Sequence, residues 1–138
     1  MHRLKLEEQQ EKSKILTDAM EQAKTRIIDI TKDETKYFPI LVGVVAKSIR
    51  ELGIDVVLIH LNAQDLKRFD KGKLEREVAK KLEKPVKIEW SKEPLEASGG
   101  AIASSLDGRT RIVDTLEQRF EALEPKLLIE AGKLLFGD

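Results

Sequence analysis

The first 30 or so residues show a helical pattern of apolar positions that no Gly or Pro interrupts. Apolar side chains recur at spacings of four, three, four and three, which places them along one helix face. The residues of this apolar stripe are Leu16, Met20, Ala23, Ile27 and Ile30. We expect this half of the helix to dock on a core. Residues 1–14 are too polar to pack alone, and they fit either a frayed helical end or a coiled coil that needs a partner helix.

A polar break at residues 31–35 separates this helix from a second one that ends at Leu52. Thr35 is the expected N-cap, which puts Pro39 in the first turn, and Gly53 suits the position after the helix. Residues 40–45 are β-branched and could form a strand, but the cap, the stop and the spacing agree on a helix. The residues of its expected buried face are Tyr37, Leu41, Val44, Val45, Ile49 and Leu52.

Two strands and a third helix are expected next. Residues 54–61 are so apolar and β-branched that they predict a buried strand. Asn62 is expected to cap the third helix, with Asp65 at the capping-box position and a break near Gly72. Residues 86–90 alternate apolar and polar side chains and predict a second strand. Its inward-facing residues are Val86, Ile88 and Trp90.

The last part of the chain predicts a hairpin and a final helix. Asp107-Gly108 joins two β-compatible runs, which is typical of a type I′ turn with positive φ at both residues. Asp114 is expected to cap the helix, with Glu117 reaching back, and Pro125 to separate residues 115–123 from residues 126–136. We expect the second piece to pack on the sheet or on a partner's helix. Its apolar face consists of Leu127, Leu128, Ala131, Leu134 and Leu135.

These elements predict an α+β fold. A long N-terminal helix precedes a two-layer head, in which helices pack on a four-stranded, mainly antiparallel sheet. We divide the chain into an N-terminal helix, residues 1–30, and a globular head, residues 31–138.

Composition narrows the function. Charged residues make up 36% of the chain, and 25 bases balance 25 acids, which argues against a general binder of nucleic acid or anionic membranes. Because there is no cysteine, disulfides and thiolate metal sites are excluded. A chain without cysteine also fits a reducing cytoplasm. No apolar run approaches the roughly 20 residues that a membrane span needs.

The search for catalytic or phosphate-binding residues yields no arrangement suited to chemistry. His60 ends a buried strand without other ligands at metal-binding spacing, so we expect a structural histidine. Nothing positions Ser104, His60 and an acid as a triad. Gly99-Gly100 leads into a strand rather than a helix, so we expect positive φ or close backbone approach there rather than a phosphate loop.

Three arginines, Arg109, Arg111 and Arg119, could contact phosphate. No aromatic stacking platform accompanies them, and Glu117 and Glu121 lie among them, so we expect a solvated surface of mixed charge. The residues alone therefore describe a non-enzymatic α+β interaction module.

Several motifs now occur together: Gly99-Gly100, Asp107-Gly108-Arg-x-Arg-Ile, Asp114-Thr-Leu-Glu-x-Arg119 and the terminal Leu134-Leu-Phe-Gly137. In this order they resemble the E subunit of the archaeal A-type and related V-type ATPases, over nearly the whole chain from about residue 10. Members of that family often have Asp-Asn-Thr where Val113-Asp114-Thr115 stands here. They usually carry a longer charged helix before this region, so we expect the chain to be a fragment with the C-terminal head.

The resemblance implies a non-catalytic peripheral-stalk, or stator, subunit of a proton- or sodium-translocating rotary ATPase, without cofactor or metal. It implies a location on the cytoplasmic side of the membrane, with only indirect membrane contact. The N-terminal helix would form a coiled coil with a second stalk subunit (G or H), and the C-terminal domain would bind the B subunit. An isolated fragment can also self-associate. The residues assigned to the partner helix are Leu16, Met20, Ala23 and Ile27, and those assigned to a head contact are Leu127, Leu128, Ala131, Leu134 and Leu135.

Two alternatives stay open at this point. One is a stator-like regulator of a flagellar or type III secretion ATPase, which shares the layout of a helix and a head. The other is a nucleic-acid-binding α+β module that uses Arg109, Arg111 and Arg119.

Overall fold

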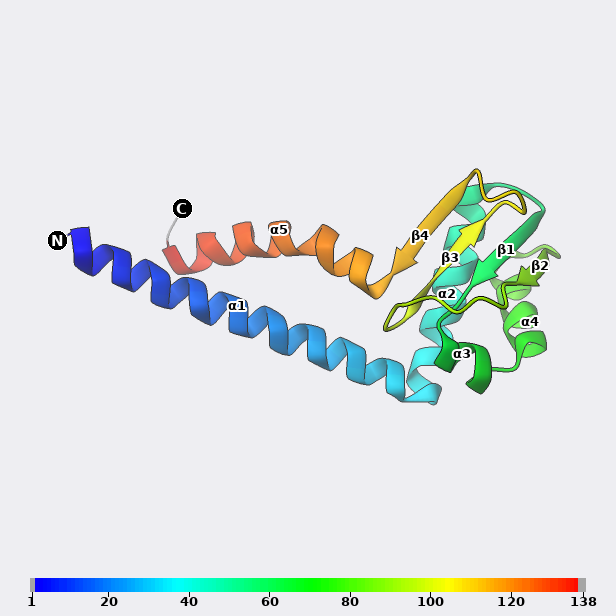
Figure 1. Ribbon diagram of the computed structural model, residues 1–138, viewed down its shortest axis with the longest axis horizontal. Coiled ribbons are helices and arrows are strands. Elements are labelled where there is room, and N and C mark those ends of the chain that lie inside the picture. Colours follow the sequence, from blue (N-terminus) through cyan, green and yellow to red (C-terminus); the bar gives the residue numbers. More distant parts are fainter. Residues whose placement is uncertain (1, 137–138) are drawn as a thin grey trace.

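The computed structural model describes the backbone of residues 2–136, and the side chains in that range except those of residues 2–6, 9, 127, 128, 130–132 and 134–136. Two long helices extend in the same direction from a compact head (Figure 1). The elements in chain order are α1 (His2–Lys32), α2 (Glu34–Leu52), β1 (Val56–His60), α3 (Ala63–Arg68), α4 (Lys71–Leu82), β2 (Lys87–Trp90), β3 (Gly100–Ser104), β4 (Arg111–Thr115) and α5 (Leu116–Phe136).

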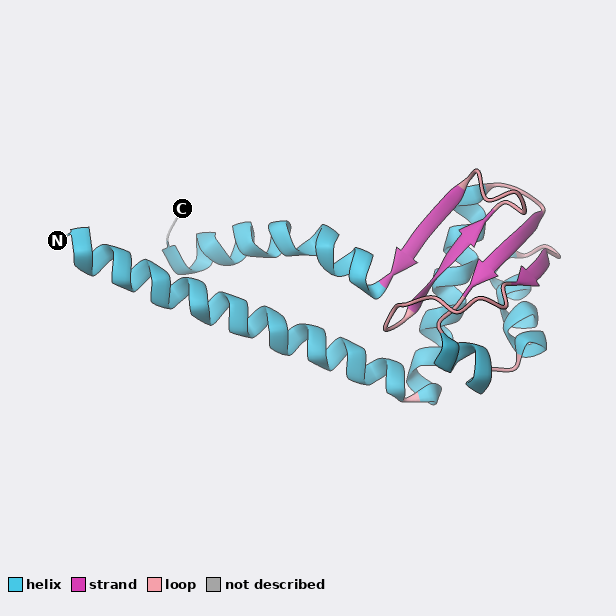
Figure 2. Ribbon diagram, in the orientation of Figure 1, coloured by secondary structure: helices cyan, strands magenta, loops and turns pink. Residues whose placement is uncertain are grey.

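The sheet has the strand order β2-β1-β3-β4. β1 and β2 are parallel, because α3 and α4 form the crossover between them, whereas β3 is antiparallel to both β1 and β4. The sheet is thus mixed, with antiparallel pairing in the majority. Helices α2 and α4 lie behind the layer of strands in Figure 2, so the predicted α+β class with helices packed on a four-stranded sheet is confirmed.

The core of the head lies between α2 and the sheet. Leu41 and Val45 of α2 are fully buried, as are Val57 and Ile59 of β1. Val86, Ile88 and Trp90 pack against this core as expected. The Trp90 indole N–H donates to Glu75 Oε1 of α4 at 2.7 Å, which ties the sheet edge to that helix.

A single residue, Asp33, separates α1 from α2. Its Oδ1 accepts hydrogen bonds from the backbone N–H groups of Thr35 at 3.1 Å and Lys36 at 3.3 Å. Asp33 is therefore the N-cap of α2, and the prediction of Thr35 was wrong. Pro39 consequently lies in the second turn, not the first. The helix ends as expected at Gly53, whose φ is 69° and whose N–H donates to the Ile49 carbonyl.

The helical segment after β1 also departs from its prediction. Asn62 caps α3 as expected by accepting from Asp65 N at 2.8 Å. The break falls at Phe69–Asp70 rather than near Gly72, because the Asp70 carboxylate caps α4 by accepting from Gly72 N and Lys73 N. The Asp65 carboxylate engages Arg68 instead of completing a capping box.

The β3–β4 hairpin is present, but its turn is not the expected two-residue type I′. Residues 105–110 connect the strands, and of the two central residues only Gly108 has positive φ, at 74°. The Asp107 carboxylate accepts from Ser105 Oγ at 2.6 Å and Arg109 N at 3.0 Å. The Ser105 hydrogen bond lowers the pKa of Asp107. Side-chain bonds thus stabilise a wider loop than the Asp-Gly pattern predicts.

The start and course of α5 correct two further predictions. Thr115 still pairs with Gly100 in the sheet, and its Oγ1 accepts from Gln118 N at 3.2 Å, so Thr115 and not Asp114 caps the helix. Glu117 accepts from Ser98 N instead of reaching back. The helix continues through Pro125 without a break. Because this site is exposed, water can satisfy the carbonyl that lacks its usual N–H donor.

Candidate partner-binding groove and the joint that orients it

Helices α1 and α5 lie side by side, and both project away from the sheet (Figure 1). Their chain directions are antiparallel, because α1 leads into the head and α5 leads out of it. Between them lies a groove of about 270 Å³ that is open to solvent. We call it the apolar groove. Its lining residues are Leu16, Ala19, Met20, Ala23, Lys24 and Ile27 of α1 with Phe120 and Leu123 of α5.

The apolar groove leaves hydrophobic surface exposed. Ile27 is 39% exposed and Leu123 is 48% exposed, and Ile30 further along α1 is 38% exposed. The expectation that the stripe from Leu16 to Ile30 docks on a core was therefore wrong for its exposed members. Among the described side chains of α1, only that of Thr31, at the end of the helix, is buried. Such contiguous apolar surface is typical of an interaction site.

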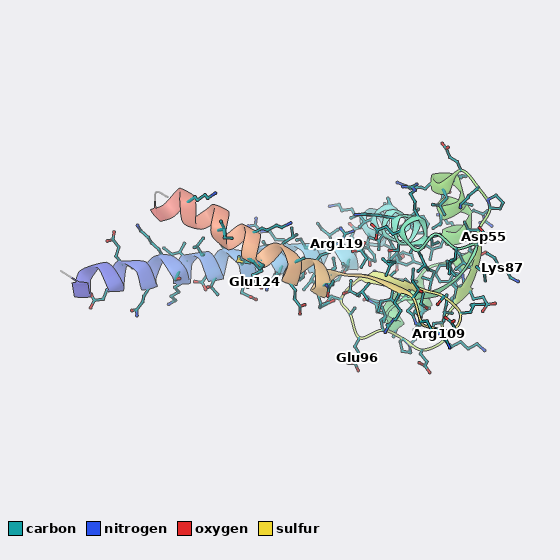
Figure 3. All side chains as sticks on the ribbon, turned by 90° about the horizontal axis from the view of Figure 1, so that it is seen from above. Asp55, Lys87, Glu96, Arg109, Arg119 and Glu124 are labelled. Carbon is teal, nitrogen blue, oxygen red and sulfur yellow. The ribbon has the colours of Figure 1, made fainter. Side chains whose placement is uncertain are left out.

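Lys24 of α1 forms an ion pair with Glu124 of α5 beside the groove. Its Nζ lies 3.6 Å from Glu124 of α5 and 3.5 Å from Glu21 of α1. The same ammonium group stands 5.9 Å from the centre of the Phe120 ring. Glu124 is labelled on α5 in Figure 3. These contacts link the two helices beside the groove.

The structure brings together all four residues that the sequence assigned to a partner helix: Leu16, Met20, Ala23 and Ile27. Whether a partner binds them stays a prediction. Sequence reasoning missed Phe120 and Leu123, although the spacing of Leu116, Phe120 and Leu123 carries the same helical signal.

The second assigned surface is formed by Leu127, Leu128, Ala131, Leu134 and Leu135. Their side chains lie outside the described residues, so this assignment stays a prediction. The backbone of α5 at these positions runs beside α1 and away from the sheet (Figure 1).

The joint between α1 and the head is centred on Arg68 of α3. Its guanidinium donates to the backbone carbonyl of Thr31, in the last turn of α1, and forms a 2.7 Å ion pair with Asp65. It also lies over two aromatic rings, 5.3 Å from the centre of Tyr37 and 4.7 Å from that of Phe69. The Arg68 side chain is 10% exposed and that of Asp65 is fully buried. We refer to these residues as the Arg68 joint.

Tyr37 extends the joint to the sheet. Its hydroxyl accepts a 2.6 Å hydrogen bond from Gly100 N at the start of β3. Burial raises the pKa of Tyr37 strongly, so the phenol stays neutral. Burial also raises the pKa of Asp65, while Arg68 and the nearby Tyr37 hydroxyl act against this. Asp65 Oδ2 nevertheless lacks a partner of proper hydrogen-bond geometry among the described residues. The buried Asp65 carboxylate therefore depends on Arg68 to compensate its charge and to donate its hydrogen bonds.

The residues tested for chemistry are placed as follows. His60 Nε2 lies 3.3 Å from Ser104 Oγ on neighbouring strands, and no acid is bonded to this pair in the described part of the chain. Arg119 forms two hydrogen bonds with Asp114, at 2.5 and 2.8 Å. The described residues contain no cluster of three or more His, Asp or Glu side chains that could hold a metal ion. Within the same residues, no helix combines the length and apolar character of a membrane span.

His60 allows a prediction about pH. Burial lowers the pKa of His60, Arg111 acts in the same direction and Glu93 opposes them. The unfolded chain therefore takes up this proton at a higher pH, near 6.5, than the folded chain does. As the pH falls below about 6.5, the free energy of unfolding should decrease until the folded pKa is passed. In urea unfolding at pH 7.5 and 5.5, His60→Gln should lose less stability than the unchanged chain, and an equal loss would contradict this prediction.

Comparison with known proteins identifies the family. The family model of the ATP synthase (E/31 kDa) subunit matches residues 1–136. The chain belongs to this family. The E subunit of the A-type ATP synthase of Thermococcus kodakarensis is 33% identical over 135 residues, which cover 96% of this chain and 64% of that protein.

Other relatives within the E-subunit family agree. The E subunit of the A-type ATP synthase of a Desulfurococcus species is 31% identical over 89% of this chain and 60% of its own length. The E subunit of the V-type proton ATPase of Manduca sexta is 26% identical over 87% of this chain and 55% of its own length. The chain thus spans 55–64% of these relatives.

Proposed function

We propose that this chain is a non-catalytic peripheral-stalk, or stator, subunit of a rotary A- or V-type ATPase that moves protons or sodium ions. Its family membership supports the complex. The observation that carries the stator role is the geometry of the two long helices. They leave the head together, α1 is joined to the head by the Arg68 joint, and an apolar groove lies between the middle of α1 and the first turns of α5.

The proposed mechanism is mechanical. A stator resists the torque of a rotor, so its connection to the catalytic head has to transmit force without yielding. The single residue between α1 and α2, the buried Asp65–Arg68 pair and the Thr31 carbonyl bond all oppose bending at that place. In this proposal residues 1–30 belong to the stalk, and residues 31–138, which include both the compact head and α5, form the C-terminal domain that binds the B subunit. The complex would hold the chain at the cytoplasmic side of the membrane.

The apolar groove is the proposed place for the second stalk subunit, G or H. A helix laid beside α1 and α5 would cover Ile27 and Leu123, whose exposure is unfavourable in water. The family match supports this assignment over a flagellar or type III secretion ATPase regulator. The nucleic-acid-binding alternative loses support, because it relies on Arg109, Arg111 and Arg119 to contact phosphate. The Arg119 guanidinium is instead hydrogen-bonded to the Asp114 carboxylate.

The proposal predicts that the chain forms a complex with the G or H subunit. At micromolar concentrations the two should elute together from a sizing column, and the mixture should show more helical circular dichroism than the sum of its parts. Ala23→Glu places a charge inside the groove and should weaken the complex at least tenfold, which is about 1.4 kcal/mol.

Thr25→Glu is the matched control, because Thr25 is exposed on α1 and lies outside the groove lining. It should leave the complex unchanged. Separate elution of the unchanged chain and its intended partner would reject the stalk proposal.

A further inference from the structure

Strand β4 lies at one edge of the sheet, and among the strands it pairs with β3 alone (Figure 1). In an antiparallel pair every second residue directs its N–H and C=O groups to the neighbouring strand, and the residues between them direct theirs away from it. Ser105 N donates to the Thr110 carbonyl and Leu116 N donates to the Gly99 carbonyl, at the two ends of a regular register. The even-numbered residues of β4 therefore bond to β3, and the odd-numbered ones direct their backbone groups outward.

Two residues of β4 consequently present unpaired backbone groups along this edge. Arg111 and Val113 each direct an N–H and a C=O away from β3, and no described residue bonds to these four groups. Both side chains are exposed, and that of Val113 is apolar. The other edge strand, β2, has Lys87 and Glu89 as its exposed side chains, and charges of this kind are typical of an edge that is protected against pairing. The β4 edge is the more open of the two.

The space beside β4 is not filled by the described side chains. A hollow of about 300 Å³, open to solvent, lies between α2, β4 and α5, and its lining includes Lys47, Ile112 and Gln118. Ile112 packs against the core of the head, so the hollow lies on the side of the sheet that α2 covers. An added strand would direct every second side chain into this hollow. The side chains between them would lie on the opposite face, beside Arg111 and Val113.

The charge of Arg111 indicates which strand fits. Its guanidinium is exposed, and it forms no ion pair with any described carboxylate. On the same face β4 carries only Val113 and Thr115 besides Arg111. A second copy of β4 would therefore bring no carboxylate to the guanidinium, whereas a strand from a different chain can supply one. Opposite charges on facing strands stabilise the pair.

We propose that β4 accepts an extended segment of a different protein chain as a fifth strand of the sheet. The segment runs antiparallel to β4, which is the more stable pairing per residue. It carries an apolar side chain opposite Val113 and, two residues later, a carboxylate opposite Arg111. Backbone hydrogen bonds hold the segment and the two side chains select it. The inference rests on the proposed function only in that the head binds another subunit, and it names the surface and the mode of binding.

The first test uses two synthetic peptides with blocked ends, Ser-Thr-Val-Thr-Glu-Thr-Ser and the same sequence with Lys in place of Glu. An NMR titration measures the binding of each peptide to the isotope-labelled 138-residue chain. The Glu peptide should bind about fivefold more tightly at low salt, because opposite charges on facing strands attract and like charges repel. High salt should reduce this ratio, since screening weakens exposed charge pairs.

Amide hydrogen exchange reports the mode of binding. In the free chain the amides of Arg111 and Val113 should exchange rapidly, whereas those of Ile112 and Asp114 should be protected by their bonds to β3. A saturating amount of the Glu peptide should slow exchange at Arg111 and Val113 roughly tenfold, and much less at Ile112 and Asp114. The inner amides thus serve as a control within the same strand.

Substitutions separate backbone pairing from side-chain contact. Val113→Pro removes an outward N–H and leaves the bonds between β3 and β4 in place, so it should weaken binding roughly tenfold. Val113→Thr keeps both the N–H and a β-branched side chain, and it should retain binding. Arg111→Glu should reverse the preference in favour of the Lys peptide. Lys14→Glu on α1 makes the same change in net charge and should leave the preference as it is.

Several results would overturn the inference. These are no binding of either peptide at millimolar concentration, equal affinities, protection of amides outside β4 alone, or binding that Val113→Pro leaves intact. A dimer of the unchanged chain that shields the amides of Arg111 and Val113 would also overturn it, since a second copy would then occupy the edge. If Val113→Pro does not fold, amide exchange in the unchanged chain decides. Association with the G or H subunit is measured separately, so the stalk proposal can stand when strand pairing fails.

Discussion

Replacement of Gly100 by alanine should destabilise the head by about 3–5 kcal/mol. Gly100 has a φ of 90°, a backbone conformation that L side chains rarely adopt. A Cβ atom there would lie 2.2 Å from the Asp114 carbonyl oxygen and 2.8 Å from the Thr115 Cα, both of which belong to the paired backbone of β4. Relief of this clash requires separation of β3 from β4, or loss of the Gly100 N–H bond to Tyr37.

Gly108→Ala is the matched control for this prediction. Its φ is 74°, but no atom lies within 4 Å of the Cβ position, so only the backbone conformation is penalised, at about 1 kcal/mol. Urea unfolding followed by the fluorescence of Trp90, the one tryptophan in the chain, measures both variants. If the two substitutions cost the same free energy, close approach at Gly100 does not contribute and our explanation is wrong.

Gly100 also illustrates what the sequence predicted well. The glycine pair indicated positive φ or close backbone approach at a strand entry, and the structure shows both at Gly100. Likewise the β-branched run before Asn62 and the alternation ending at Trp90 led to the correct strands. In each case the signal is local, because propensity and spacing within a few residues decide the element.

The wrong details have a common physical origin. Local patterns favoured Thr35 as the N-cap of α2 and Asp114 as the N-cap of α5. In the structure Asp33 caps α2 and Thr115 caps α5, because the preceding helix and strand determine where each helix begins. Thr115 is held by its pairing with Gly100, a residue that local reasoning about the helix does not include. Pro125 was expected to interrupt a helix, and solvent exposure at that site allowed the helix to continue.

One wall of the groove could be predicted and the other could not. The stripe on α1 is visible in the spacing of Leu16, Met20, Ala23 and Ile27, and all four line the groove. That α5 would supply the opposite wall depends on the direction in which β4 leads out of the sheet, which no local pattern encodes. The Arg68 joint was missed for the same reason, since Arg68 and Thr31 are 37 residues apart in sequence.

Replacement of Arg68 by methionine should destabilise the protein by about 3–5 kcal/mol, because it leaves the buried Asp65 carboxylate without its cation. Oδ1 would lose both guanidinium contacts, and Oδ2 already lacks a hydrogen-bond partner among the described residues. Adding Asp65→Asn removes the stranded charge and should restore about 1–3 kcal/mol, measured by urea unfolding as a double-mutant cycle.

Arg50→Met is the control. The Arg50 guanidinium makes one long hydrogen bond, to the exposed Lys81 carbonyl at 3.4 Å, so its loss should cost less than about 0.5 kcal/mol.

A structural role for this pair in orienting α1 requires a second measurement, because stability alone does not report direction. The chain has no cysteine, so spin labels at Lys14→Cys on α1 and Lys84→Cys on the head report one distance. Loss of the Arg68 bond to the Thr31 carbonyl should broaden the distribution of that distance, whereas Arg50→Met should leave it narrow. A narrow distribution in the Arg68 variant would mean that Asp33 and the α1–α5 contacts hold the helix by themselves. Broadening would instead identify the Arg68 bond to the Thr31 carbonyl as the contact that keeps α1 aligned with the head, as the proposed stalk role requires.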